Sequence, residues 1–145
     1  MFDFKLPSTS GVDFELSKCS KPLVLFFYPR DNTSGCTVEN QDFAKLYPKF
    51  IKLGFEVLGI SRDTLKSHHN FKNKYNLPFD LLADPEENVC NMFSVMKDKK
   101  MYGKPVRGIE RSTFIFDKKK SIIKEWRKVS VDGHAQMVLD YIKTL

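Results

Sequence analysis

The sequence predicts an α/β fold in which helices flank both faces of a central mixed β-sheet. Three observations lead to this prediction. An apolar run at residues 23–28 is followed by a turn and a helical pattern of apolar residues. Strand and helix patterns then alternate further along the chain, and a strand hairpin and an amphipathic helix end it. Alternating strands and helices form a largely parallel sheet covered by helices, to which a hairpin adds antiparallel strands.

The length and composition of the chain fit one domain of this kind. Its 145 residues, 41% of them hydrophobic and 13% aromatic, are enough to bury a substantial core. The sequence contains no internal repeat, low-complexity tract or long linker. Residues 1–145 are therefore predicted to form a single domain.

The beginning of the sequence and its cysteines indicate a cellular compartment. The first residues lack the basic, apolar and small-residue regions of a secretory signal. Three cysteines, Cys19, Cys36 and Cys90, do not make a disulfide framework and suit a reducing environment. We therefore expect a cytoplasmic protein that does not associate with membranes.

The first predicted elements are an N-terminal β-hairpin and the central strand. Two short alternating segments, residues 4–6 and 12–16, lie on either side of a turn-forming stretch and are typical of an edge hairpin. The run at residues 23–28 is too short to span a membrane, so it predicts a buried strand. Cys19 lies in the polar turn between them, where no role is expected for it and a disulfide partnership is the alternative.

Strands and helices alternate in the middle of the chain. A helix begins near Cys36 and ends at Gly54, and Pro48 is expected to kink it or divide it into two segments. The elements predicted next are a strand at 55–60, a helix at 64–75 and a short strand at 80–83.

A further helix start is predicted at Asp84, which would be the N-cap, with Pro85 at the first helical position. The apolar residues expected to face inward from this helix are Val89, Met92, Phe93 and Met96. Residues 97–107 are predicted to form an irregular loop. A hairpin of residues 113–116 and 121–129, and a last helix from about Asp132 to Ile142, complete a thioredoxin-like arrangement.

Cys36 occupies a position that favours a reactive thiol. Five turn-forming residues separate the central strand from the following helix: Pro29, Asp31, Asn32, Ser34 and Gly35. Cys36 therefore falls in the first helical turn, where backbone N–H groups and the positive end of the helix dipole favour a thiolate.

The residues around Cys36 resemble the active-site signature of the peroxiredoxins. The pattern Pro29-x-x-x-Thr33-x-x-Cys36 follows Phe-Tyr and precedes Thr-x-Glu, and the segment is most similar to the bacterioferritin-comigratory (PrxQ) branch. Four more motifs match in order, at residues 58–63, 82–85, 102–104 and 111–115. The resemblance covers nearly the whole chain. It implies the thioredoxin-like fold and a thiol-dependent peroxidase that needs no metal or organic cofactor.

The spacing Thr33-x-x-Cys36 places a hydroxyl where a disulfide reductase carries the first thiol of C-x-x-C. Dithiol exchange is thereby lost, but a hydrogen-bonding group remains beside the thiolate, and a helix-capping role for Thr33 is compatible with this. The resemblance identifies Arg111 as the active-site arginine, with a surface ion pair as the alternative. It also implies that Pro29 shields the thiolate from water. Glu39 would orient Arg111, unless it is an ordinary exposed first-turn glutamate.

Other combinations of residues predict less. Adjacent His68 and His69 point about 100° apart on a helix, and no cysteine or carboxylate stands at ligand spacing, so an ordinary helix surface is predicted rather than a metal site. A Cys36/His134 pair suggests a cysteine hydrolase, but no third orienting group is identifiable. His134 is predicted to lie in the first turn of the last helix.

The charge of the chain is concentrated in one segment. Residues 97–128 contain twelve Lys or Arg and four Asp or Glu, so the net charge of this segment is +8. The net charge of the whole chain is +6, so the remaining residues are slightly acidic. This predicts a basic face, interpreted as solvated charge rather than a nucleic-acid contact. The alternative function is a redox-sensing binding protein with a basic, nucleic-acid-facing surface.

The predicted activity is the reduction of hydrogen peroxide and alkyl hydroperoxides through a sulfenic acid on Cys36, as part of antioxidant defence. Thioredoxin, glutaredoxin or glutathione would then restore the thiol, and a monomer is expected. In the PrxQ branch a resolving cysteine usually follows the peroxidatic one by five or about 36 residues, where this chain has Gln41 and Lys72. Either Cys90 resolves the sulfenic acid or an external thiol attacks it directly, and we favour the external thiol.

Overall fold

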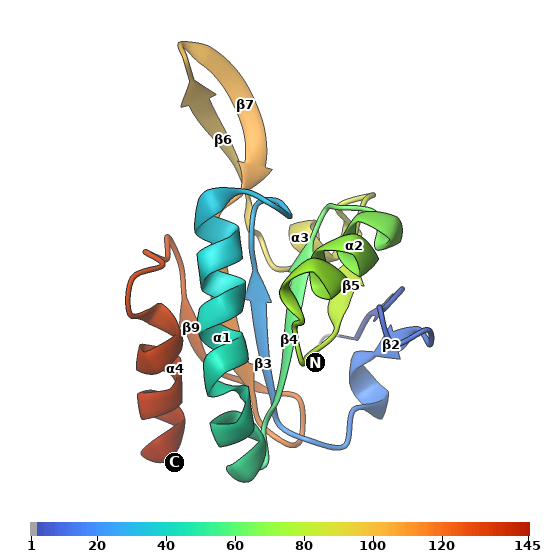
Figure 1. Cartoon of the computed structure of the whole chain (residues 1–145), viewed down its shortest axis with the longest axis vertical. Helices are drawn as coiled ribbons and strands as arrows, with labels where there is room; N and C mark the ends of the chain where they lie inside the picture. Colours follow the sequence, from blue (N-terminus) through green and yellow to red (C-terminus); the bar gives the residue numbers. More distant parts are fainter. Residues whose placement is uncertain (1–2) are drawn as a thin grey trace.

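The computed structural model describes residues 3–145, except for the side chains of residues 99 and 101. A five-stranded sheet of strand order β5-β4-β3-β8-β9 forms the centre of the molecule (Figure 1). Its strands are β3 (Leu23–Phe27), β4 (Glu56–Ser61), β5 (Leu81–Ala83), β8 (Ser112–Phe116) and β9 (Ile122–Trp126). Strand β3 is parallel to β4 and antiparallel to β8, so the predicted mixed sheet and α/β class are confirmed.

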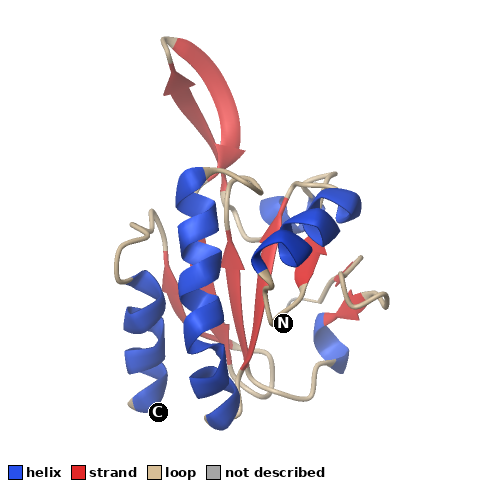
Figure 2. Ribbon diagram, in the orientation of Figure 1, coloured by secondary structure: helices blue, strands red, loops and turns tan. Residues whose placement is uncertain are grey.

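Alternate residues of β3 face two separate cores, since successive side chains of a strand point to opposite faces. On one face, Val24 and Phe26 pack against helices α1 (Ser34–Lys52), α2 (Leu65–Tyr75) and α4 (His134–Lys143). On the other face, Leu25 and Phe27 pack against the short helix α3 (Asn88–Met92), the 3-10 turn Leu16–Lys18 and the N-terminal segment. Helices therefore lie on both faces of the sheet, as Figure 2 shows.

The N-terminal hairpin is present and covers one edge of the sheet. Strands β1 (Lys5–Leu6) and β2 (Phe14–Glu15) pair antiparallel, as predicted but over fewer residues. Between them, Ser8 forms an isolated antiparallel bridge with Leu82 of β5. The backbone N–H of Thr9 donates to the carbonyl of Leu81 at 3.1 Å, and its side chain accepts from Leu81 N–H. Strand β5 therefore does not present a free edge.

Pro48 was expected to kink helix α1 or to divide it, and it does not divide it. The helix is continuous from Ser34 to Lys52 with Pro48 inside it. A proline removes one intrahelical hydrogen bond, and the buried Phe43 and Phe50 anchor the helix on both sides of that gap. Gly54, with φ of +84°, follows the end of the helix as expected.

Helix α3 is shorter than predicted. It begins at Asn88, after Glu87 in the left-handed region with φ of 64°, so Asp84 is not its N-cap and Pro85 does not open it. Val89 and Phe93 are buried as predicted, but Met92 is 40% exposed. Met96 is buried in a strand instead of a helix.

Residues 97–107 were predicted as a loop, and this is wrong. Strands β6 (Met96–Met101) and β7 (Lys104–Ile109) form a separate antiparallel hairpin that projects beyond the sheet (Figure 1). Its turn has positive φ at Tyr102 and Gly103, the conformation that two-residue hairpins require.

The basic segment does not form the single face that was predicted. The β6–β7 hairpin leads to Ser112, which pairs with Phe27 at one end of the sheet. Residues 118–120 follow β8 at the opposite end, where the buried Lys120 donates to the carbonyl of Lys21 at 2.7 Å. The positive charges are thus divided between two ends of the molecule. No helix in residues 3–145 is long and apolar enough to cross a bilayer.

Candidate active site

Cys36 lies in the first turn of α1, as predicted, and is almost completely buried. Its side chain belongs to the core cluster that α1, α2 and α4 form with β3. The helix begins at Ser34 because Thr33 remains extended as the N-cap. The carbonyl of Cys36 accepts a 2.9 Å hydrogen bond from the side-chain amide of the buried Asn40, one turn later. The sulfur is therefore held on a fixed backbone at the positive end of a helix dipole.

Arg111 joins the Cys36 sulfur to Glu39. Its Nη2 donates to Cys36 Sγ at 3.5 Å, and its Nη1 donates to Glu39 Oε1 at 2.6 Å. Arg111 immediately precedes β8, which is paired with β3, so neighbouring strands bring together residues 75 positions apart. The geometry thus brings together three of the residues selected from the sequence, and Glu39 is buried rather than exposed.

The burial of Glu39 and Arg111 alters their acid–base properties. Burial raises the pKa of Glu39 to about 7, against the lowering effect of Arg111. Burial opposes the charge of Arg111, but Glu39 and Cys36 together outweigh it and raise the Arg111 pKa. The second carboxyl oxygen of Glu39 is buried without a hydrogen-bond partner. The site therefore places a permanent cation at the sulfur and a titratable carboxyl group behind that cation.

Gly35 permits the approach of the arginine and was not selected as a site residue from the sequence. A Cβ at this position would lie 3.3 Å from Arg111 Nη2, closer than an ordinary van der Waals contact. The absence of a side chain therefore lets the guanidinium lie against the first turn of α1. The sequence signal was present, since Gly35 directly precedes Cys36, but it was interpreted only as a turn former.

Thr33 and Pro29 belong to the segment that joins β3 to α1 just before Cys36. Thr33 is exposed, and its hydroxyl donates to the carbonyl of Arg30 at 3.0 Å instead of capping the helix. Pro29 is half-buried and lines an open depression of about 370 Å³. The other residues lining this depression are Glu110, Arg111, Lys128 and Val129. Pro29 thus borders the approach to Arg111.

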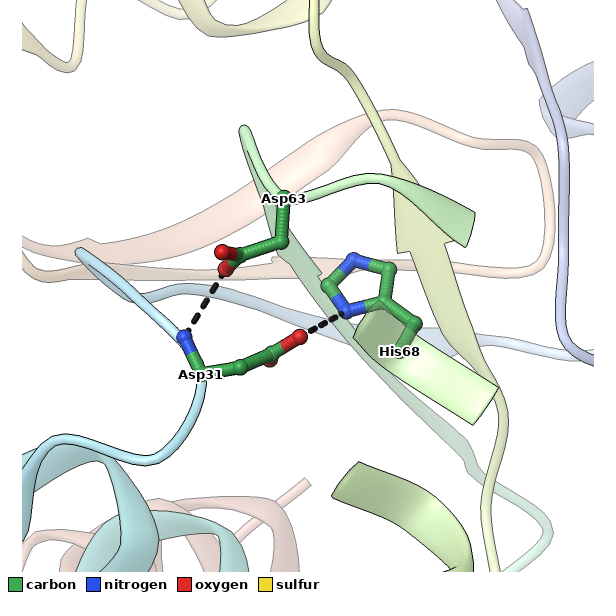
Figure 3. Close-up of side chains that lie close together, drawn as sticks. All are labelled: Asp31, Asp63 and His68. Carbon is green, nitrogen blue, oxygen red and sulfur yellow. Dashed lines mark hydrogen bonds and ion pairs between the residues drawn. The ribbon is translucent and has the colours of Figure 1, made fainter. Parts of the chain in front are cut away.

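His68 is fully buried, so its prediction as a helix-surface residue is wrong. Its Nδ1 lies 2.8 Å from Asp31 Oδ2, and its Nε2 lies 2.8 Å from the carbonyl of Leu82. Asp63 accepts the backbone N–H of Asp31 at 2.8 Å (Figure 3). The carboxylates that sequence spacing did not find beside His68 therefore come from the ends of two neighbouring strands.

The two remaining cysteines lie away from Cys36. Cys90 is buried in the core on the opposite face of the sheet, and burial, followed by Asp84, raises its pKa strongly. Cys19 is partly exposed near the N-terminal segment, and all three thiols are free. Lys72 stands at one of the two positions where a resolving cysteine was considered. Its ammonium group donates to the Phe79 carbonyl and to Asp80.

His134 does not pair with Cys36 in the described contacts. It is the first residue of α4, as predicted, and its Nε2 lies 2.8 Å from Thr113 Oγ1. Burial, with a smaller contribution from Arg111, lowers its pKa to about 4. The geometry therefore gives no support to a cysteine–histidine hydrolase.

Comparison with known proteins identifies similar sequences and structures. Residues 1–125 match the model of the AhpC/TSA family. The chain is 46% identical over 143 residues to peroxiredoxin Bcp of Xanthomonas campestris, covering 98% of this chain and 89% of that protein. It is 44% identical over 144 residues to peroxiredoxin Bcp of Bacillus subtilis, covering 99% and 92% of the two chains.

A solved structure of the Xanthomonas campestris bacterioferritin comigratory protein has the same fold. The TM-score is 0.92 at 44% identity, and the match covers 97% of this chain and 90% of the other. That structure was determined in a trapped intermediate and ligand complex to explain the alkyl peroxide reduction activity of the Xanthomonas protein.

Proposed function

Because this chain belongs to the AhpC/TSA family, in its peroxiredoxin Bcp (PrxQ) branch, we propose that it is a thiol-dependent peroxidase with Cys36 as the nucleophile. Its substrates are hydrogen peroxide and alkyl hydroperoxides, and its role is antioxidant defence. The observation that carries the residue assignment is the contact of Arg111 Nη2 with Cys36 Sγ, supported from behind by Glu39.

The first half of the reaction oxidises Cys36. The thiolate attacks one peroxide oxygen, the O–O bond breaks, and Cys36 becomes a sulfenic acid as the other oxygen leaves with the bonding electrons and takes up a proton. Arg111 favours the thiolate and stabilises the negative charge that develops on the leaving oxygen. Pro29 limits the access of water, and the exposed Thr33 hydroxyl donates to the bound peroxide instead of to Arg30.

The second half of the reaction returns Cys36 to a thiol. An external thiol attacks the sulfenic sulfur and releases water, and a second thiol then breaks the mixed disulfide and leaves Cys36 reduced. The position of Cys90 across the sheet supports this route over an internal disulfide. Thioredoxin, glutaredoxin and glutathione are the candidate reductants. The three free cysteines fit a reducing compartment such as the cytoplasm.

Steady-state peroxide consumption tests the proposal. Wild type, Cys36→Ser and the matched control Cys19→Ser are compared with thioredoxin, glutaredoxin and glutathione in separate assays. Cys36→Ser is expected to lose all activity because a neutral alcohol cannot replace a thiolate, whereas Cys19→Ser should equal wild type. If Cys36→Ser kept more than about a tenth of wild-type activity, the assignment of the nucleophile would be wrong. A wild type that reacts once and does not turn over would indicate a redox sensor instead of an enzyme.

A further inference from the structure

A buried polar cluster lies behind the loop that joins β3 to α1. Asp31 in this loop accepts hydrogen bonds from the hydroxyl of Tyr28 at 2.6 Å and the hydroxyl of Ser67 at 2.8 Å. His68 Nδ1 lies 2.8 Å from the same Asp31 oxygen that Ser67 contacts. Figure 3 shows His68 pointing from α2 toward the Asp31 carboxylate, with the Asp63 carboxylate facing the backbone nitrogen of Asp31.

The hydrogen-bond inventory fixes how many protons the cluster holds. The carbonyl of Leu82 can only accept, so His68 Nε2, 2.8 Å away, carries a hydrogen. One more proton lies between His68 Nδ1 and Asp31 Oδ2, since two atoms that both only accept would repel at 2.8 Å. Whichever atom holds that proton, the Asp31–His68 pair is neutral overall, and His68 offsets the carboxylate charge in a fully buried position.

The hydrogen bonds that the cluster already makes argue against a cation site. Ligand atoms of Asp31, Asp63 and His68 lie within 4.8 Å of one another. Both His68 nitrogens are engaged, and Asp63 Oδ2 accepts from the Asp31 N–H and from the Ser61 hydroxyl. A cation would have to displace these bonds. The cluster therefore acts as a clamp between protein groups.

The clamp joins three elements to the loop. The Asp31 side chain is bound to Ser67 and His68 of α2, its backbone to Asp63 after β4, and His68 in turn to Leu82 of β5. The next residue, Asn32, has φ of 63°, a left-handed conformation that asparagine adopts more readily than most other non-glycine residues. The position of the loop thus depends on contacts made behind it.

We propose that His68 is a positioning residue of the peroxidase reaction, acting through Asp31 on the loop that carries Pro29 and Thr33. This inference rests on the proposed function. His68 touches neither Cys36 nor substrate in this mechanism. The proton shared by His68 and Asp31 holds Asp31 to α2, and through His68 to β5, and so keeps the loop in position beside Cys36 and Arg111. A shift of about 1 Å in reacting groups is enough to cost on the order of 100-fold in rate.

The test uses substitutions that keep similar size. His68→Gln removes the ring nitrogen that shares a proton with Asp31, and Asp31→Asn removes the carboxylate. His69→Gln is the matched control, because His69 is the neighbouring residue on the same helix and is exposed. Ser67→Ala deletes one hydrogen bond to Asp31 and leaves the charge pair intact, so it remains informative if His68→Gln folds poorly.

Two rates are measured by stopped flow on each reduced, folded variant: oxidation of Cys36 by hydrogen peroxide and its alkylation by iodoacetamide. We expect His68→Gln and Asp31→Asn to slow oxidation by about 10- to 100-fold and alkylation by less than about twofold, with a smaller loss of oxidation rate in Ser67→Ala. His69→Gln should match wild type. Alkylation reports the thiolate, whereas peroxide also needs the positioned loop, so a purely global effect on folding would not separate the two rates.

The outcomes distinguish this inference from the proposed function. A wild type that does not react with peroxide would overturn the proposed function. A reactive wild type with unchanged oxidation rates in folded His68→Gln and in Ser67→Ala would overturn the positioning role alone. Equal loss of both rates would also overturn it, because His68 would then act on the thiolate itself. A change in oxidation rate on adding EDTA would show that the cluster holds a metal ion, and would overturn its role as a clamp.

Discussion

At the scale of single residues, the contact between Gly35 and Arg111 connects helix composition with reactivity. A glycine in the first turn of a helix is less favourable than alanine by up to about 1 kcal/mol. Gly35 nevertheless leaves room for the guanidinium that contacts Cys36. Gly35 therefore makes the first turn of α1 less stable than alanine would, but it allows Arg111 to contact Cys36.

Gly35→Ala is expected to slow the reaction with peroxide without lowering stability. The free energy of unfolding should rise or stay constant, while oxidation by peroxide slows by about 10-fold because the new methyl group pushes Arg111 Nη2 away from the sulfur. Urea unfolding and stopped-flow oxidation measure the two effects. Ser34→Ala, at the neighbouring exposed position, is the control. Unchanged oxidation in Gly35→Ala would mean that the arginine adjusts without loss.

Glu39 leads to a pH-dependent prediction. Its pKa in the folded protein is about 7, above the ordinary value of 4.5, so between these pH values the unfolded chain releases a proton that the folded protein keeps. The free energy of unfolding should therefore fall as pH rises from 4.5 to 7, by about 2 to 3 kcal/mol from this group, and then level off. Glu39→Gln should remove this contribution.

The comparison of variants isolates Glu39 from other titrating groups. Because the pKa of His134 is lowered from 6.5 to about 4, this residue makes the free energy of unfolding rise with pH between these values. Wild type and Glu39→Gln share this contribution, so it cancels in their comparison. Denaturant unfolding at several pH values is the measurement, with Glu86→Gln as an exposed control. Parallel pH curves for wild type and Glu39→Gln would show that Glu39 ionises normally.

At the scale of secondary-structure elements, α1 and α3 place two thiols on opposite sides of the sheet. Cys36 belongs to the core of α1, and Cys90 to the core of α3. A disulfide requires Cα atoms within about 7 Å, so a bridge would need one of these helices to leave its core. The fold therefore opposes an internal disulfide.

Peptide mapping after one equivalent of peroxide, without reductant, tests this arrangement. We expect sulfenic or sulfinic acid on Cys36, with Cys90 recovered as a free thiol. Cys90→Ala should turn over with an external thiol at the wild-type rate. A Cys36–Cys90 bridge in the map would contradict the external route and would require a large movement of α3.

The elements also show what sequence patterns can and cannot predict. The strand at 23–28 and the helix start near Cys36 were correctly predicted, because burial and turn chemistry are local properties. The β6–β7 hairpin was missed because, among its described side chains, only those at its base, Met96 and Ile109, join a core, and the lysine-rich remainder lacks apolar alternation. The Arg111 contact depends on pairing between distant strands, and only the family resemblance pointed to it.

His68 was misjudged for a related reason. Its spacing with Phe71 on α2 placed it on the inward face, and that signal was present in the sequence. Its partners Asp31 and Leu82 lie 37 and 14 residues away, so only the folded chain brings them together. A buried histidine is thus predictable from helical periodicity, whereas the groups that satisfy it are not.

At the scale of the whole molecule, the division of the basic segment between two ends of the sheet argues against a nucleic-acid surface. Binding to duplex DNA should be weak, independent of sequence and largely lost between 50 and 200 mM salt, since phosphate contacts release counterions. Fluorescence anisotropy with two unrelated duplexes measures this. Tight binding that survived 200 mM salt would favour the alternative binding-protein function.

The bridge between Ser8 and Leu82 bears on self-association in solution. An uncovered strand edge can template the addition of a strand from another molecule. Residues 7–9 occupy that position along β5, and Lys124 and Glu125 place charge on β9 at the opposite edge. We therefore expect a monomer that resists aggregation. Thr9→Pro, which loses the backbone donor, should associate with increasing concentration in sedimentation velocity, whereas Thr9→Val should remain monomeric because it keeps the N–H bond to Leu81.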